Sequence, residues 1–231
     1  MSKTLKMLGN KLLISIVIIG LCFSTAILHN MLVKNYEFSS LSKYNIFSKT
    51  IHMTQGVDNS SMADLEHKIT VRILAQETLI SFLQAIPLLN RLDVIDKAVP
   101  RLKIYLTSGG GSVIAGFGVM NLMKKYQDKY NAKFTTVADK FCYSMCFAIL
   151  QQGDTRLATY YTMLGTHPAS GGDPRALRLL EYMMAENVMM KSYYFISKGY
   201  RAWVELYIND FYHNPDLAIY YGLIDGVEKG E

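Results

Sequence analysis

Three consecutive glycines, Gly109 to Gly111, connect a strand-like apolar stretch to a stretch with helical spacing. Glycine lets a backbone approach a ligand closely, and N–H groups at a helix N-terminus can hold an anion or a developing oxyanion. The loop lacks the Gly-Lys-Ser/Thr end of a phosphate loop, and it does not fit the GxGxxG pattern of dinucleotide sites. Taken alone, it fits both an oxyanion hole and a tight turn.

Ser144 is the first candidate for covalent chemistry. It follows a strand-like stretch and opens an apolar helical stretch. The field of a helix N-terminus favours a serine nucleophile there, and the N–H of the next residue can point at its substrate. A helix cap is nevertheless the simpler interpretation of a lone serine at this position.

Two further residues could move and orient a proton. Among the five histidines, only His167 ends a strand-like core stretch, beside a loop where a general base would sit. Asp210 is the later carboxylate best suited to orient an imidazole. Taken singly, a strand-end histidine is more often structural, and an aspartate of this kind is read as a turn or cap residue.

The elements that must position these residues alternate along the chain. Strands are expected at 69–74, 102–106, 134–137, 157–161 and 163–166, and helices at 77–92, 113–126, 144–150, 173–196 and 216–221. We expect Asp173 to cap the long helix, with Pro174 in its first turn, and Pro87 to kink or break an earlier helix. The alternation predicts an α/β domain over residues 67–231.

Composition excludes several classes of protein. Half of the 231 residues are hydrophobic and 19% are charged, so the chain can bury a full core and wholesale disorder is excluded. Beyond residue 30 there are 21 basic and 19 acidic side chains, and no basic stripe could bind nucleic acid. Three cysteines without a CxxC pair predict neither a disulfide scaffold nor a structural zinc, and we expect no metal and no cofactor.

The N-terminal segment carries three lysines and then an uncharged apolar run from Leu12 to Leu28. Its seventeen residues would span about 26 Å as a helix, slightly less than a hydrocarbon core of about 30 Å, and continuing to Val33 makes the run long enough. Residues 1–33 are therefore expected to be a signal peptide or a membrane anchor, and residues 34–66 a linker. Positive charge before the run places the rest of the chain on the non-cytoplasmic side.

The order of these features resembles the proteolytic subunit of the Clp protease, which has the ClpP/crotonase fold. The matching stretch runs from about His67 to Val227, and its closest segments are 104–116 (IYLTSGGGSVIAG), Ser144-Met145 and 221–225 (YGLID). Their order and separations make the case, rather than any single segment. The resemblance implies a domain that folds as a spiral of β-β-α units and acts as a peptidase that cleaves peptide bonds. In this chain the expected transmembrane or signal helix precedes that domain.

The resemblance also assigns roles to the three candidate residues. Ser144 would be the nucleophile, followed by methionine as in the family. His167 would be the general base, at the end of a strand, although Pro168 follows it directly where the family commonly has His-Gln-Pro. Asp210 would fix the tautomer of the imidazole.

The glycine loop has an implied role as well. The backbone N–H groups of Gly111 and Met145 would form the oxyanion hole. Gly110 and Ser112, in the same loop, are predicted to bind substrate. Gly109 stands where the family usually has proline; glycine is more flexible than proline but leaves the amide donor in place.

Partners follow from the same resemblance. A homo-oligomeric ring is expected, with peptides or unfolded protein segments as substrates. The segment between His167 and Asp210 is shorter than in the family, where it holds the long helix through which two rings stack. Relatives work with a cytoplasmic ATPase; because export would separate this domain from ATP, we expect an ATP-independent peptidase without a Clp ATPase.

Alternatives remain open on the sequence. A signal-peptide-peptidase-like membrane protease would use a lysine base, for which Lys133 and Lys140 lie nearest to Ser144. A catalytically inactive ring subunit or binding scaffold would have its triad out of register. A crotonase-type acyl-CoA enzyme shares the fold but would need no Ser/His/Asp set.

Two cysteines, Cys142 and Cys146, flank Ser144. Residues four apart on one helix share a face, but their geometry is poor for a disulfide. We therefore expect both to be small buried residues, and neither to be the nucleophile.

Overall fold

The computed structural model describes residues 48–87, 89, 91–92, 97–168, 170, 173–207, 209 and 211–228. The chain divides into two compact units: the larger comprises residues 48–73 and 101–231, and the smaller residues 1–47 and 74–100. Helix α2 (Asn59–Gln84) begins in the larger unit and contributes its last turns to the smaller one. All described residues of the candidate site belong to the larger unit.

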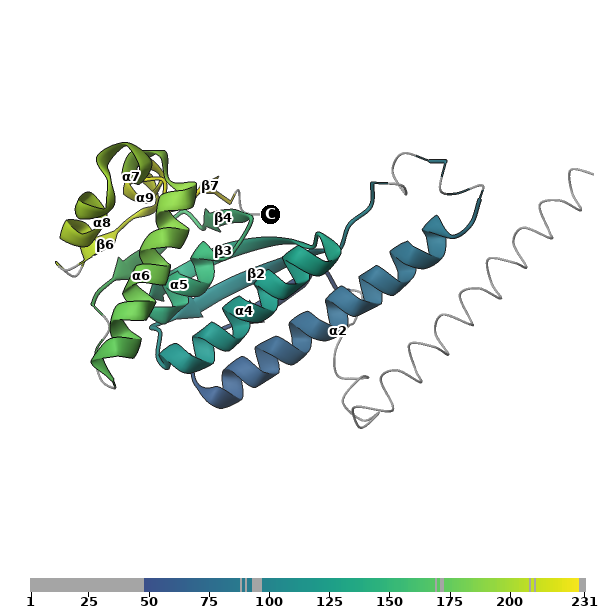
Figure 1. Ribbon diagram of the computed structural model, residues 1–231, viewed down its shortest axis with the longest axis horizontal. Coiled ribbons are helices and arrows are strands. Elements are labelled where there is room, and N and C mark those ends of the chain that lie inside the picture. The colour runs from purple at the N-terminus through teal and green to yellow at the C-terminus, as the bar shows by residue number, and fades with distance from the viewer. Residues whose placement is uncertain are drawn as a thin grey trace, which may run out of the picture. The chain divides into compact units, whose positions relative to one another are not determined.

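In the described part of the chain, seven strands form one sheet (Figure 1). Their bounds are β1 (Thr50–Met53), β2 (Arg101–Ser108), β3 (Lys133–Tyr143), β4 (Thr155–Ala158), β5 (Met163–Thr166), β6 (Phe211–His213) and β7 (Gly226–Val227). Five strands run parallel in the order β1-β2-β3-β4-β7. β5 pairs in parallel with the last residues of β3, and β6 pairs antiparallel with β5. This confirms the predicted α/β class.

The helices that follow β2 cover the sheet and build the site. They are α4 (Val113–Tyr130), α5 (Met145–Gln151), α6 (Pro174–Lys191), α7 (Tyr193–Lys198), α8 (Tyr200–Tyr207) and α9 (Pro215–Tyr220). Helix α5 contacts β2, β3 and β5 of the sheet and lies between α4 and α6 (Figure 1). The short α5 is therefore enclosed by the sheet and by two longer helices.

The core explains why the strand β2 and the helix α5 form where they do. In β2, Leu102, Ile104 and Leu106 are buried and alternate with more exposed residues, which is the pattern of a strand packed on one face. Helix α5 has the sequence MCFAILQ, and all seven of its residues are buried. A helix without a charged residue can be buried on every side. The turn that precedes α5 consequently rests on a well-packed base.

The strand expected over residues 69–74 is wrong, because this segment lies within α2. Its sequence, ITVRIL, alternates apolar and polar residues as a strand would. Over a longer window, however, the buried residues Met62, Leu65, Ile69 and Ile73 recur at the three- and four-residue spacing of a helix face. The longer period matches the structure, and the short alternation is incidental.

The single helix expected over 173–196 is divided into α6 and α7. Ser192 separates them and caps α7, because its side chain accepts a hydrogen bond of 3.2 Å from the N–H of Phe195. Asp173 caps α6 as expected and accepts a hydrogen bond of 3.0 Å from the N–H of Arg175. Between His167 and β6 the chain therefore forms three separate helices, α6, α7 and α8, in place of the single long helix expected.

The N-terminal expectations meet the structure only in part. β1 lies within the segment 34–66 assigned to a linker, and it pairs with β2 at the edge of the sheet. Within the described residues, no helix is both long and apolar enough to cross a membrane. The apolar run from Leu12 to Leu28, and with it the predicted signal or anchor over residues 1–33, lies outside the described residues.

Candidate active site

Ser144 occupies the turn between β3 and α5. Its φ of 54° and ψ of −124° form a backbone conformation that residues with a side chain rarely adopt. Its N–H donates to the carbonyl of Gly165 (2.9 Å), and its carbonyl accepts from the N–H of Ala148 (3.2 Å). Among the described residues, the Ser144 side chain makes no capping hydrogen bond, so the helix-cap interpretation is wrong. A serine on such a strand-to-helix turn has the geometry of a nucleophile elbow.

The glycine loop packs directly against this turn. A Cβ on Gly110 would lie 2.6 Å from the Cβ of Ser144 and 3.0 Å from the backbone nitrogen of Met145. Gly110 and Gly111 both have positive φ, at 95° and 144°. Only glycine meets both demands, because a side chain would collide with the turn and would strain the backbone. The loop can therefore bring its backbone next to the hydroxyl-bearing residue.

A short β-bridge between Val57 and Gly111 holds the loop in place. The N–H of Val57 donates to the carbonyl of Gly110 (2.9 Å), and the N–H of Ser112 donates to the carbonyl of Val57 (2.6 Å). These two bonds use the groups on either side of Gly111 and leave its own N–H out of the pairing. The bridge thus fixes the position of Gly111 without using its N–H group.

His167 follows β5 directly and is half-buried. Its Nδ1 lies 2.8 Å from the carbonyl oxygen of Pro168. A carbonyl only accepts hydrogen bonds, so Nδ1 carries the proton in this arrangement. In the neutral imidazole, Nε2 is then the nitrogen with a free electron pair, which is the form that a general base requires.

A cavity of about 240 Å³ joins these parts of the site. Ser144 and Met145 line it from the turn, Gly111 lines it from the loop, and His167 lines it from the end of β5. The N–H of Met145 belongs to the first turn of α5, where backbone donors have no partner within the helix. The predicted nucleophile, the predicted base and the two residues predicted to supply the oxyanion donors therefore line one cavity.

Other predicted site residues are placed differently. Ser112 caps α4, because its hydroxyl accepts a hydrogen bond of 3.3 Å from the N–H of Ala115. Neither Ser112 nor Gly110 is among the residues that line the cavity, so both support the loop, and their contact with substrate stays a prediction. Asp210 lies outside the described residues.

Sequence reasoning missed the apolar wall of the cavity. Val113 of α4, Met184 of α6 and Tyr207 of α8 form this wall. The methionines of α6 were a visible signal, but helical spacing alone assigns a residue such as Met184 to the core or to a subunit contact. Only the packing of three separate helices around the turn makes it part of the site.

Lysine is not found in this cavity among the described residues that line it. Lys133 instead forms an ion pair with Asp154 (3.4 Å), and Lys140 is exposed. The geometry therefore gives no support to a serine-lysine pair built from these two residues.

A disulfide joins Cys142 and Cys146, with a Cα–Cα distance of 5.3 Å. The expectation of two free buried cysteines is therefore wrong in part: both are fully buried, but they are bonded. The reason is that they do not lie on one helix. Cys142 belongs to β3 and Cys146 to α5, and the turn at Ser144 brings the two cysteines within bonding range.

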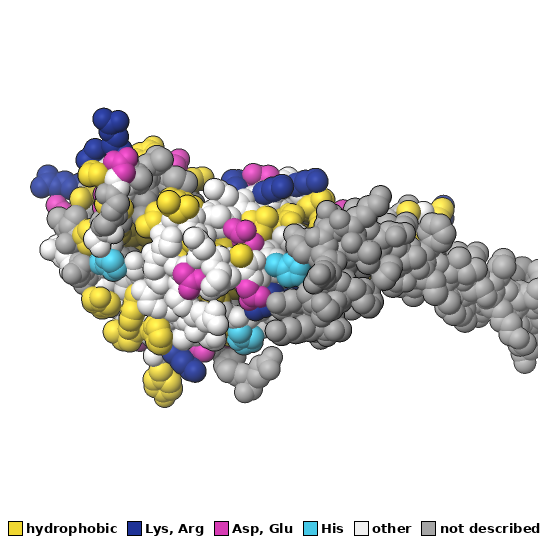
Figure 2. Space-filling view, turned by 90° about the horizontal axis from the view of Figure 1, so that it is seen from below, with side chains coloured by type: hydrophobic (Ala, Val, Ile, Leu, Met, Phe, Trp, Pro, Cys, Tyr) yellow, Lys and Arg dark blue, Asp and Glu magenta, His cyan; other side chains and the backbone are white. Residues whose placement is uncertain are grey.

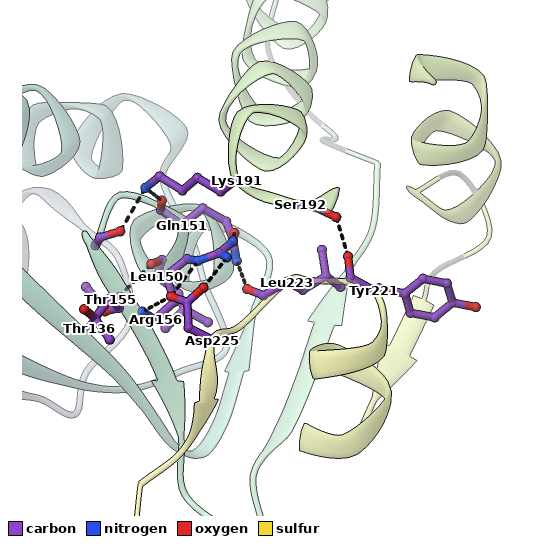
Figure 3. Close-up of polar contacts among 11 residues, drawn as sticks. Thr136, Leu150, Gln151, Thr155, Arg156, Lys191, Ser192, Tyr221, Leu223 and Asp225 are labelled. Atoms are coloured by element: carbon purple, nitrogen blue, oxygen red, sulfur yellow. Dashed lines mark hydrogen bonds and ion pairs between the residues drawn. The ribbon is translucent and has the colours of Figure 1, made fainter. Parts of the chain in front are cut away.

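A buried polar network lies at the other end of α5 (Figure 3). Arg156 is 1% exposed, and its guanidinium donates to both carboxylate oxygens of Asp225, at 3.2 and 2.7 Å. It also donates to the side-chain oxygen of Gln151 at 2.8 Å. Burial alone would raise the pKa of Asp225, but the hydrogen bonds from Arg156 hold it below its usual value. The Asp225 of the YGLID segment is thus a structural anchor.

Lys191, the last residue of α6, extends this network. Its ammonium donates to the backbone carbonyls of Gln151 (2.6 Å) and Gly153 (2.8 Å), where α5 ends (Figure 3). Burial, and then the positive charge of Arg156, lower the pKa of Lys191 to about 8. Cations at the C-terminal end of a helix satisfy its last carbonyls and oppose its dipole. Helix α5 is therefore fixed at this end by charged side chains.

Comparison with known proteins places these features in a family context. The model of the family described as Clp protease matches residues 56–231. Among solved structures, the chain is similar to a ClpP1 mutant from Listeria monocytogenes, with a TM-score of 0.62, 13% sequence identity, and coverage of 83% of this chain and 97% of that one. At this identity the likeness shows the fold, and it confirms the predicted ClpP-like architecture. No curated protein matches the chain.

Proposed function

The chain belongs to the Clp protease family, whose model covers residues 56–231, and we propose that it is a serine peptidase with Ser144 as its nucleophile. The observation that carries this proposal is the turn at Ser144. Its hydroxyl is not used to cap α5, and it shares a cavity with an imidazole whose Nε2 has a free electron pair. A residue that kept this strained conformation only for structure would be better replaced by glycine.

In the proposed mechanism, His167 accepts the proton of the Ser144 hydroxyl through Nε2 while the serine oxygen attacks the carbonyl carbon of a peptide bond. The backbone N–H groups of Gly111 and Met145 stabilise the oxyanion of the tetrahedral intermediate. His167 then returns the proton to the leaving amine, and water hydrolyses the acyl-enzyme by the same path. Gly111 and Met145 both line the cavity that Ser144 lines, which supports this assignment.

Asp210 is proposed to orient His167. The antiparallel ladder of β5 and β6 pairs Leu164 with His213 and Thr166 with Phe211. In the sequence, His167 directly follows Thr166, and Asp210 directly precedes Phe211. We propose that the carboxylate of Asp210 accepts the Nδ1–H of His167 in place of the carbonyl of Pro168 and stabilises the imidazolium that forms during the reaction.

We further propose that the domain acts outside the cytoplasm, without ATP, on peptides or unfolded segments. The lysines and the apolar run before residue 29 support export or anchoring. The Cys142–Cys146 disulfide adds an independent argument, because disulfides persist mainly in oxidising compartments. Protease added to intact cells or spheroplasts should cut the domain; protection until the inner membrane is broken would refute this location.

A homo-oligomer is proposed on the basis of the exposed aromatic surface. Figure 2 shows groups of exposed hydrophobic side chains on the end of the larger unit that carries β6 and α8. The exposed aromatic side chains include Tyr161 (90%), Tyr193 (84%), Tyr160 (72%), Tyr220 (67%) and Tyr212 (53%). Exposed apolar surface of this kind is typical of a protein interface. Sedimentation of the purified protein would test it, and a stable monomer would refute it.

The test of the catalytic proposal is covalent labelling. The full-length protein, solubilised in detergent, is treated with a fluorophosphonate, and the modified residue is located by mass spectrometry. We expect labelling at Ser144 and none in Ser144→Ala. Replacement of His167 by alanine should abolish labelling as well; retained labelling there would favour a lysine base, and an unlabelled wild type that is folded and oligomeric would favour a scaffold.

A further inference from the structure

The disulfide between Cys142 and Cys146 encloses the proposed nucleophile. With a sequence separation of four, its ring contains Ser144 and both of its neighbours. Cys142 lies in the middle of the sheet, paired with Ser108 of β2 on one side and Leu164 of β5 on the other. Cys146 lies in the first turn of the buried α5. The bond therefore ties the sheet to the helix across the turn that carries the reacting hydroxyl.

We propose that this disulfide positions Ser144 and the N–H of Met145 for catalysis, and that Cys142 and Cys146 are positioning residues. Here Ser144 is taken as the nucleophile, so the role rests on the proposed function. The turn holds Ser144 at a φ of 54°, a conformation that would relax without contacts that oppose it. The main ones are the hydrogen bond from the Ser144 N–H to Gly165 and the contact with Gly110. A covalent tie across the turn removes the alternative conformations.

The size of the ring argues for a local role rather than a global one. The stabilisation that a disulfide gives by restricting the unfolded chain grows with the length of the loop it closes. A ring with a sequence separation of four restricts very little of the unfolded chain. What it restricts in the folded protein is the geometry between Cys142 and Cys146, where the hydroxyl and one oxyanion donor lie. Loss of the bond should therefore affect catalysis more than folding.

Displacement of a catalytic group by about 1 Å can lower the rate about 100-fold. We thus expect reduction of the disulfide to lower kcat about 100-fold, with KM changed by less than about threefold, because the apolar wall of the cavity is untouched. Both sulfur atoms are fully buried, so reduction requires opening of the turn and should be slow. Dithiothreitol would become its cyclic disulfide, leaving two thiols on the protein.

The experiment compares the full-length protein in oxidised, reduced and reoxidised form with the double variant Cys142→Ala, Cys146→Ala. The rate of fluorophosphonate labelling at Ser144, kcat and KM for a peptide, and Tm are measured for each. We expect slow labelling and low kcat in the reduced protein and the double variant, Tm within a few degrees of the oxidised form, and full recovery on reoxidation. Reductant should have no further effect on the double variant.

Equal labelling rates in the oxidised and reduced protein would overturn the proposal, and so would mass spectrometry that finds Cys142 and Cys146 as free thiols in the protein as isolated. A wild type that is not labelled at Ser144 would instead refute the proposed function. In that case hydrogen exchange decides the positioning role, since it needs no catalysis. Faster exchange of residues 143–148 after reduction would support it, and unchanged exchange would overturn it.

Discussion

The two ends of α5 are built in opposite ways. At the N-terminal end, Ser144 keeps a disfavoured backbone conformation, and both Ser144 and Met145 line a cavity. At the C-terminal end, Lys191 donates to the last carbonyl of the helix and to that of Gly153, and Arg156 donates to the side chain of Gln151. One buried helix thus combines a strained end that is open to a ligand with a saturated end that anchors it. The difference indicates where function and where stability reside.

The largest effect is expected at the strained end. Ser144→Gly should abolish peptidase activity, by at least about 10⁴-fold, and should raise the free energy of unfolding by about 1 kcal/mol, because glycine adopts positive φ without strain. Ser144→Ala is the matched control: it should remove activity equally but without that gain in stability. Urea unfolding and peptide hydrolysis measure both quantities. A glycine variant less stable than the alanine variant would show that this turn is not strained.

The second prediction concerns the anchored end. Asp225→Ala leaves the buried guanidinium of Arg156 without its carboxylate partner and should lower the free energy of unfolding by about 3 kcal/mol. Asp128→Ala breaks the exposed ion pair with Lys124 and should change it by less than about 0.5 kcal/mol. In both variants the folded fraction should hydrolyse peptide at the normal kcat. A loss of kcat in folded Asp225→Ala would show that the two ends are coupled.

The third prediction separates two adjacent glycines. Gly110→Ala places a Cβ against Ser144 at a φ of 95° and should lower kcat about 100-fold. Gly109→Ala serves as the control, because a Cβ there meets nothing within 4 Å and the φ of Gly109 is not positive. Peptide hydrolysis by the two variants gives the comparison. Equal activities would mean that the glycine loop does not fix the position of the turn.

The two ends of α5 could not be predicted equally well from the sequence. The positions of the glycine loop, Ser144 and His167 at the ends of strands could be predicted, because a short apolar stretch precedes each of them. The partner of Asp225 could not, since Arg156 reaches it only through the pairing of β4 with β7. The disulfide was missed for a similar reason: its feasibility depends on where β3 ends and α5 begins. Residue type indicated chemistry, whereas long-range contacts required the fold.

The helices and strands, too, could be predicted where a local pattern encodes them and not where long-range packing does. The apolar residues of α4 have an unambiguous helical period, and the residues of β2 alternate cleanly, so both were predicted. In α2, a short alternation around Val71 concealed the longer helical period. The cavity wall at Met184 and Tyr207 comes from two helices whose packing no local pattern encodes. Periodicity therefore predicts an element, but not which of its buried residues meet a cavity.

The smallest expected effect concerns the middle of α5, where His213 of β6 packs edge-on against Phe147. Burial lowers the pKa of His213 to about 4, and the unfolded chain should protonate it near 6.5. Between these values the unfolded state binds the additional proton, so the free energy of unfolding falls as the pH falls through this window. Protonation of His213 in the unfolded chain should make the free energy of unfolding about 2 kcal/mol lower at pH 5 than at pH 7.5.

His213→Phe removes this titration and isolates it from the other groups of the protein. Urea unfolding of wild type and variant at pH 7.5 and pH 5 gives the difference, which should be about 2 kcal/mol larger for the wild type. Phe211, which stacks on the same ring, should accommodate the new side chain. Identical pH dependence in the two proteins would mean that His213 opens to water in the folded state, and that the middle of α5 is less firmly packed than either of its ends.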